Sequence, residues 1–141
     1  VDTWSTDPQL QGIDGIAVGP DGAVYANSVT QSKLFRIDVG SDGAAAKVTE
    51  LTPSQPLKGT DGMRFGDDGV LYVAENGNGQ VDAVTITGDA AAIKPVATGL
   101  DGPTALEKVG NTLWVLEAKI GKMGDPNEKG PYYMIPFGLG G

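Results

Sequence analysis

The sequence predicts an all-β fold, a β-propeller of about three four-stranded blades, and three observations predict it. The segment DGIAVGPDGAVYANS, which begins at Asp14, aligns without a gap with DGMRFGDDGVLYVAE, which begins at Asp61. A third copy, DGPTALEKVGNTLWVLE, begins at Asp101 and needs two extra residues to align. Repeats of roughly 40–50 residues are typical of propeller blades, and the strand content of each copy favours blades over helical repeats.

The second observation is that each full unit contains four short β-rich runs with almost no helical periodicity. The runs predicted as strands are Ile16–Val18, Ala23–Ala26, Lys33–Val39 and Ala46–Leu51 in the first unit, and Met63–Phe65, Val70–Ala74, Gln80–Ile86 and Ile93–Ala97 in the second. An Asp-Gly pair separates the first two runs of each unit, and this pair predicts a hairpin with a type I′ turn.

The third observation is the high content of turn residues, 22 Gly and 9 Pro among 141 residues. Tight turns between short strands require such residues. The chain therefore reads as one partial propeller domain over residues 1–141, with repeats starting near 14, 61 and 101. Two full units, most of a third and an opening fragment at Val1–Leu10 amount to about half of a six-bladed ring.

A half ring leaves blade faces open, so we expect a second half-propeller as partner. The partner is either another copy of this chain or a separate N-terminal half. The chain begins with Val1 rather than Met, and we expect the sequence to be a piece of a longer one.

Composition excludes several kinds of chemistry. Without Cys there is no disulfide, thiol nucleophile or Cys zinc site, and without His there is no imidazole base or His metal site. What remains is the chemistry of carboxylates, amides, hydroxyls, Lys and Tyr. The lack of Cys leaves the compartment open, whether secreted, periplasmic or cytoplasmic.

The charge balance and the length of the apolar runs argue against two classes of partner, nucleic acid and membranes. Ten Lys and Arg against 18 Asp and Glu give a net charge of −8. A chain this acidic is not expected to bind nucleic acid, because phosphate contacts need clustered basic residues. No apolar run reaches the roughly 20 residues of a membrane span, so no membrane partner is expected. The acids either keep the chain soluble or suit a hard cation.

Once the repeats are aligned, the chain resembles the C-terminal half of the senescence-marker-protein/gluconolactonase/luciferin-regenerating-enzyme family of six-bladed propellers. The segments that carry this resemblance are GIDGIAVGPDGAVYANS, GTDGMRFGDDGVLYVAENGNGQV and GLDGPTALEKVGNTLWVLEAKIG, together with the late segment Gly130–Phe137. The resemblance covers nearly all of the chain, although Asp-Gly blade motifs also recur in other propellers.

The resemblance implies a divalent cation, often Ca²⁺, at the top of the central channel. The family's Asp-Gly ligand falls on Asp61, and its Asn-Gly ligand falls on Asp14, so this sequence has Asp where Asn is usual. The family's early Glu and first Asn ligands have no counterpart here. The implied function is calcium-dependent hydrolysis of a lactone or related ester, with Asp61 as a metal ligand and catalytic base. The half-length chain also fits a non-catalytic propeller module that binds a ligand or protein.

Asp14 and Asp61 also have a structural alternative, in which Asp and Gly only shape the entry to each inner strand.

Other residues of the repeats are expected to have structural roles. Asp101 is expected to be structural, and the stretch from Glu75 to Gly79 is expected to be a turn. The equivalent aromatics Tyr25, Tyr72 and Trp114 are expected to pack between blades, and the residues expected to be solvated turn acids are Asp21, Asp42, Asp67, Asp68 and Asp89. Segment Lys119–Lys129 is expected to form a long surface loop.

Overall fold

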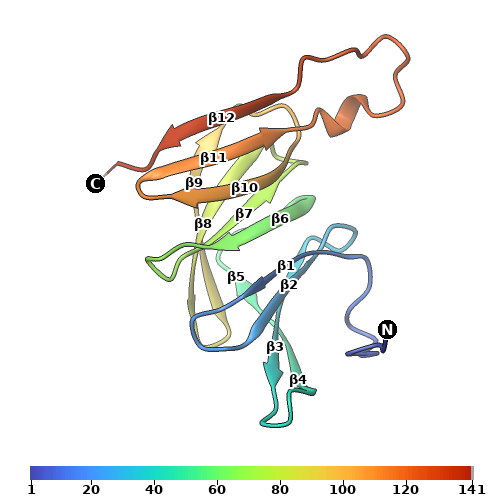
Figure 1. Cartoon of the computed structure of the whole chain (residues 1–141), viewed down its shortest axis with the longest axis vertical. Coiled ribbons are helices and arrows are strands. Elements are labelled where there is room, and N and C mark those ends of the chain that lie inside the picture. The colour runs from blue at the N-terminus through green and yellow to red at the C-terminus, as the bar shows by residue number, and fades with distance from the viewer. Residues whose placement is uncertain (141) are drawn as a thin grey trace.

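The computed structural model describes residues 1–140 and contains three sheets, antiparallel except for one short edge strand, arranged as successive blades (Figure 1). Gly141, the last residue of the predicted domain, lies outside the described residues. The first blade consists of β1 (Ile13–Val18), β2 (Val24–Ser28), β3 (Lys33–Val39) and β4 (Ala45–Glu50). The prediction of an all-β partial propeller is confirmed.

The second blade has the same four-stranded order and one addition. Its strands are β6 (Thr60–Phe65), β7 (Leu71–Glu75), β8 (Gln80–Thr87) and β9 (Ala90–Thr98). The short β5 (Thr52–Pro53) follows the first blade along the chain and pairs in parallel with the outermost strand β9. This added strand ties the outer edges of two blades together.

The third blade has three strands, so the four-stranded description holds only for the first two. Its strands are β10 (Pro103–Val109), β11 (Thr112–Glu117) and β12 (Tyr133–Gly138). A long loop with one 3-10 turn, η1 (Ile120–Lys122), joins β11 to β12, as predicted for this surface segment. No helix among residues 1–140 is long and apolar enough to cross a membrane.

The hairpin between the first two strands of a blade differs from the expected type I′ turn. In the first blade, Gly22 N–H bonds to the Gly19 carbonyl and Gly19 N–H bonds to the Ala23 carbonyl, at 3.0 and 2.9 Å. Only Gly22 has a positive φ, of 80°, whereas a type I′ turn needs two such residues. The expectation was wrong because three residues, Pro20 to Gly22, form the connection, and Pro20 fixes φ near −65° at its first position. The loop is a type I turn closed by one left-handed Gly.

The core lies between the blades. One cluster joins the first two blades and includes Tyr25, Leu34, Met63 and Val73. The ring of Tyr25 meets the ring of Phe65 edge to face, with centroids 5.0 Å apart. A second cluster joins the second and third blades through Tyr72 and its neighbours. The predicted packing role of Tyr25 and Tyr72 is confirmed, and burial of these faces fixes each blade against the next.

Candidate functional site

Asp14 and Asp61 occupy the same position in neighbouring blades. Each is the second residue of an inner strand, β1 or β6, and these two strands lie against one another. In both hairpins the strand register shifts at this point: Ile13 pairs with Ser28 and Ile16 with Ala26, while Thr60 pairs with Glu75 and Met63 with Val73. Each Asp-Gly pair therefore lies in a β-bulge, which redirects side chains and is frequent next to functional sites.

Glycine follows each Asp because the inner strands approach closely here. A Cβ atom on Gly15 would collide with the Asp61 carbonyl oxygen and the Asn27 side chain. A Cβ atom on Gly62 would lie 2.5 Å from the carbonyl oxygen of Thr104 in the third blade. The Asp-Gly pattern thus combines an acid with the only residue that lets adjacent inner strands come this close.

Two asparagine side chains hold the Asp-Gly segments in place. Asn27 is fully buried at the end of β2; its Oδ1 accepts a 3.0 Å bond from Gly15 N–H, and its Nδ2 donates to the Asp61 carbonyl oxygen. Asn76, just after β7, donates from Nδ2 to Asp61 Oδ2 at 3.1 Å. Asn27 therefore links the heads of β1 and β6, and Asn76 orients the Asp61 carboxylate.

The electrostatics of Asp61 reflect burial and a like charge. Burial raises the pKa of the Asp61 carboxyl, and the Asp14 carboxylate, which lies within hydrogen-bonding reach, raises the pKa further. The bond from Asn76 and the Gly62 backbone oppose this shift. Two crowded carboxylates favour either a shared proton or a cation between them.

The third blade supplies Thr104 at this position, not Asp101. Pro103 pairs with Glu117, and Leu106 pairs with Val115, so Thr104 and Ala105 stand where Asp61 and Gly62 stand in the second blade. The alignment of Asp101 with Asp61 was wrong because the third unit has extra residues before its inner strand. Asp101 instead forms a 2.7 Å ion pair with Lys122, which agrees with its expected structural role. Among residues 1–140 no group of three or more His, Cys, Asp or Glu is arranged to hold a metal ion.

A second pair of acids, Glu75 and Asp82, is buried behind the Asp61 segment. Glu75 Oε2 accepts bonds from the Lys58 N–H and from Asn78 Nδ2, and the distance to Asn78 is 3.1 Å. Gln80 Nε2 donates to Glu75 Oε1 at 3.0 Å and to Asp82 Oδ1 at 2.9 Å. Burial, with the neighbouring Glu75, raises the pKa of Asp82 to about 8.

This network positions the site from behind. Glu75 is fully buried, and its bonds fix Lys58, which precedes the Asp61 strand, and the loop that carries Asn76. Of the predicted turn Glu75–Gly79, residues 76–79 form a turn, whereas Glu75 is the last residue of β7. Within this turn, Asn76 contacts the candidate site residue Asp61. One sequence signal could have identified this network, namely a difference between the two repeats. Glu75 of the second blade stands where the first blade has Ser28.

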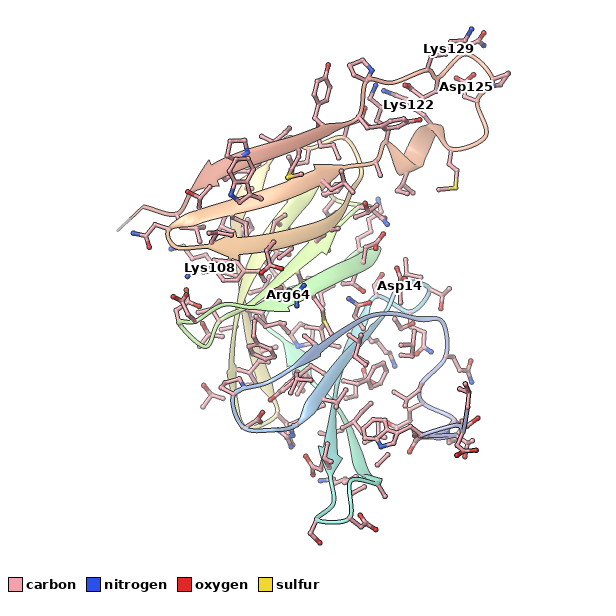
Figure 2. All side chains as sticks on the ribbon, in the orientation of Figure 1. Asp14, Arg64, Lys108, Lys122, Asp125 and Lys129 are labelled. Carbon is pink, nitrogen blue, oxygen red and sulfur yellow. The ribbon has the colours of Figure 1, made fainter. Side chains whose placement is uncertain are left out.

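The long loop leaves the third blade at the same end as the candidate site. Each second strand ends where its inner strand begins, so the segment after Glu117 starts beside the head of β10. Figure 2 shows Asp14 on the same side of the molecule as Lys122, Asp125 and Lys129 of this loop. A cavity of about 420 Å³ lies under the loop, lined in part by Glu117, Lys119 and Tyr132.

Two further sequence expectations need correction. Trp114 is 38% exposed on the outer face of the third blade, so it does not pack between blades within this chain. Asp21 and Asp68 are more than solvated turn acids, because each accepts a 2.9 Å bond from the hydroxyl of the following repeat tyrosine, Tyr25 or Tyr72. Burial, assisted by Asp21, raises the pKa of Tyr25 to about 12.

Comparison with known proteins identifies the fold. A scan against family models found no match, and neither did a search of curated proteins. Solved structures that are similar include a virginiamycin B lyase from Staphylococcus aureus, with a TM-score of 0.61, 27% identity, and coverage of 79% of this chain and 37% of that one. A luciferin-regenerating enzyme matches with a TM-score of 0.65, 15% identity, and coverage of 83% and 40%. A gluconolactonase-like protein matches with a TM-score of 0.65, 16% identity, and coverage of 88% and 44%.

The chain spans less than half of the length of each of these three structures. Sequence identities of 15 and 16% show a shared fold and do not show a shared activity. The propeller fold of the senescence-marker-protein/gluconolactonase/luciferin-regenerating-enzyme resemblance is thereby confirmed, and this chain has the architecture of about three of its blades.

Proposed function

We propose that this chain supplies part of the active site of a calcium-dependent hydrolase that acts on lactones or related esters. Asp14 and Asp61 are the proposed metal ligands, and Asp61 is the proposed catalytic base. One observation carries the proposal: Asp14 and Asp61 lie at equivalent heads of neighbouring inner strands, each in a β-bulge, with the two carboxylates close together. Asn27 bonds the Gly15 N–H beside Asp14, and Asn76 bonds the Asp61 carboxylate. The gluconolactonase-like neighbour supports the substrate class.

The donor set fits a hard cation in kind. Asp14, Asp61 and Thr104 present oxygen donors at successive inner-strand heads, and Ca²⁺ prefers oxygen ligands. The number of donors is smaller than Ca²⁺ takes, which is about six to eight. Further oxygens must therefore come from water, substrate or another part of the ring.

Asp61 has the properties of a base in such a site. Its carboxylate oxygens accept a proton, and the bond from Asn76 to Oδ2 fixes the orientation of the group. A bound divalent cation would act as a Lewis acid toward the lactone carbonyl. Asp61 would take a proton from the water that attacks the carbonyl carbon, and would return it to the leaving oxygen when the acyl C–O bond of the lactone breaks. Asn27 keeps the Asp61 backbone against the Asp14 strand.

The alternative is a non-catalytic propeller module that binds a small ligand or protein. It is favoured by the small ligand set, with no group of three acids among residues 1–140, and by Asp14 at a position where the family resemblance implies Asn. Such a module would keep the fold and lack metal-linked stability.

Thermal unfolding in millimolar Ca²⁺ or Mn²⁺ separates these functions. A cation that binds only the native state raises the free energy of unfolding, by about 2.7 kcal/mol when its concentration is 100 times the Kd. We expect a higher Tm for the wild-type chain and no change in Asp61→Ala. Asp101→Asn is the matched control, because it removes a carboxylate near the same end and should keep the metal response. A wild-type Tm that ignores both cations would refute the metal site.

Hydrolysis assays then test the catalytic role. Lactone turnover by the assembled protein should fall by at least 100-fold in Asp61→Asn, which keeps the shape of the side chain and loses the base. Turnover that survives this substitution would remove Asp61 from catalysis while leaving its role as a ligand to the thermal experiment.

A further inference from the structure

The two ends of the half ring expose apolar residues whose equivalents in the other blades lie at an interface between blades. At the first blade, Ile16 and Val18 are 64% and 66% exposed. At the third blade, the exposed apolar residues are Val109, Trp114, Leu116 and Met134. We name the first set the leading face and the second set the trailing face.

Strand register shows what these faces correspond to. Ile16 stands at the position of Met63 in the second blade, and Val18 stands at the position of Phe65. Met63 is buried and Phe65 packs against the first interblade core. The leading face of the first blade is therefore a copy of the surface by which the second blade packs on the first.

The trailing face has the same relation to the opposite side of a blade. Trp114 stands at the position of Tyr72, and Met134 stands at the position of Val81, because Leu116 pairs with Met134 as Ala74 pairs with Val81. Tyr72 and Val81 are both buried against the third blade. The two exposed ends are thus the two complementary halves of one kind of interface.

One position distinguishes the open ends from the second interface within the chain. In the second interface, Lys108 of the third blade reaches Asp67 and Asp68 in the turn of the second blade, and Gly66 gives it room. At the open ends, Val18 stands in the place of Lys108, and Val109 stands in the place of Gly66. Neither open face therefore carries the charge that the second interface has at this position, and the two faces are apolar where they would meet.

We propose that a second copy of this chain covers both faces and closes a six-bladed ring. A two-fold axis would place the trailing face of each copy on the leading face of the other, with Trp114 against Val18 as Tyr25 lies against Phe65. Closure would also surround the channel with two Asp14/Asp61 pairs. The inference extends the proposed function, since it supplies oxygen donors that one chain lacks.

The first test is the mass in solution, measured by light scattering during gel filtration, with calcium and with a chelator. We expect a species of about twice the 14.5 kDa of one chain. Trp114→Glu and Val18→Lys should each give monomers, because each charge is placed in both interfaces of the ring. Ala92→Glu is the matched control; it puts a charge on an exposed position of the central blade and should leave the dimer intact.

Mixing the two variants gives the decisive result. One interface of the mixed pair is wild type, and the other places the new Glu opposite the new Lys. We therefore expect Trp114→Glu and Val18→Lys to form a dimer together although neither does so alone. Circular dichroism melts check that each variant is folded, and Met134→Glu repeats the test at a second trailing-face position.

Three outcomes would overturn the proposal. They are a wild-type monomer at 100 µM or so, open polymers in place of a dimer, and folded variants that remain monomeric when mixed. A dimer whose Tm ignores calcium would support ring closure and refute the metal site, so the two proposals fail separately.

Discussion

The second and third blades carry the same apolar pattern with opposite exposure. Tyr72 and Val81 of the second blade are buried, whereas their equivalents Trp114 and Met134 in the third blade are exposed. The difference arises because the second blade has a neighbour on each side and the third has a neighbour on one side only. The strand pattern specifies which face of a blade is apolar, and the neighbouring blade decides whether that face leaves water.

The same comparison holds for the candidate site. The first two blades present Asp at the head of the inner strand, and the third presents Thr104. Their backbones share a register shift at this position, so the bulge belongs to the blade and the side chain varies on it. A metal or substrate site in this fold is therefore a matter of which residue each blade places on a common scaffold.

The largest effect is expected when an apolar side chain that packs between two blades is shortened and its exposed equivalent is shortened for comparison. Met63→Ala should lower the free energy of unfolding by about 2–5 kcal/mol, because it leaves a cavity between two blades. Ile16→Ala, at the equivalent position of the first blade, should cost within about 0.5 kcal/mol in the Trp114→Glu variant, where the leading face stays in water. Chemical denaturation measures both, and equal losses would contradict the assignment of the open face.

A smaller effect is expected at the close approach of the inner strands. Gly62→Ala places a Cβ 2.5 Å from the Thr104 carbonyl oxygen, and such overpacking costs typically about 1–3 kcal/mol. Gly121→Ala is the control, because nothing lies within 4 Å of its Cβ position. Denaturant unfolding of both variants provides the measurement. A Gly62→Ala variant as stable as wild type would mean that the second and third blades lie further apart than described.

The smallest expected effect concerns the buried acid pair of the second blade. The folded pKa of Asp82 is about 8 and its ordinary value is 3.8, so the native state holds a proton that the unfolded chain loses. The contribution of Asp82 to stability is fully present below about pH 4 and is lost as the pH rises toward 8. Asp82→Asn should remove this loss and stabilise the protein at pH 8 by on the order of 1–2 kcal/mol.

The control for the acid pair is Asp42→Asn, which changes an exposed turn acid whose Oδ1 accepts the Ala44 N–H. Thermal melts from pH 4 to pH 8 should show the wild-type slope in this control and a flatter slope in Asp82→Asn. Parallel slopes in all three proteins would show that Asp82 does not hold a proton in the native state at these pH values.

Much of the fold was predictable from sequence because blades depend on local signals. Apolar alternation and turn residues predicted β3 at its observed bounds, and they predicted β6 and β8 with ends displaced by a few residues. The turn type was wrong because a short Asp-Gly signal does not reveal how many residues form the loop. The start of the third unit was displaced because Asp101-Gly102 repeats the motif three residues before Thr104.

The site was only partly predictable. Asp14 and Asp61 were marked by their repeated position, since a repeat places equivalent residues at equivalent points of successive blades. Asn27, Asn76 and the Glu75–Asp82 pair were read as structural or missed, because their partners lie on other strands and loops. Hydrogen bonds between segments distant in the chain leave no local pattern.

By itself, the sequence determined the blade repeat, the apolar face of each strand, and the pair of acids at two inner-strand heads. These follow from short-range rules: the two-residue period of strands, the turn preferences of Gly and Pro, and the blade-length repeat. Only the tertiary structure decided that Asp14 and Asp61 meet, that Glu75 and Asp82 are buried together, and that Trp114 and Val18 face water. Those outcomes depend on which blade packs against which, because burial and proximity are properties of neighbours in space and not of neighbours in the chain.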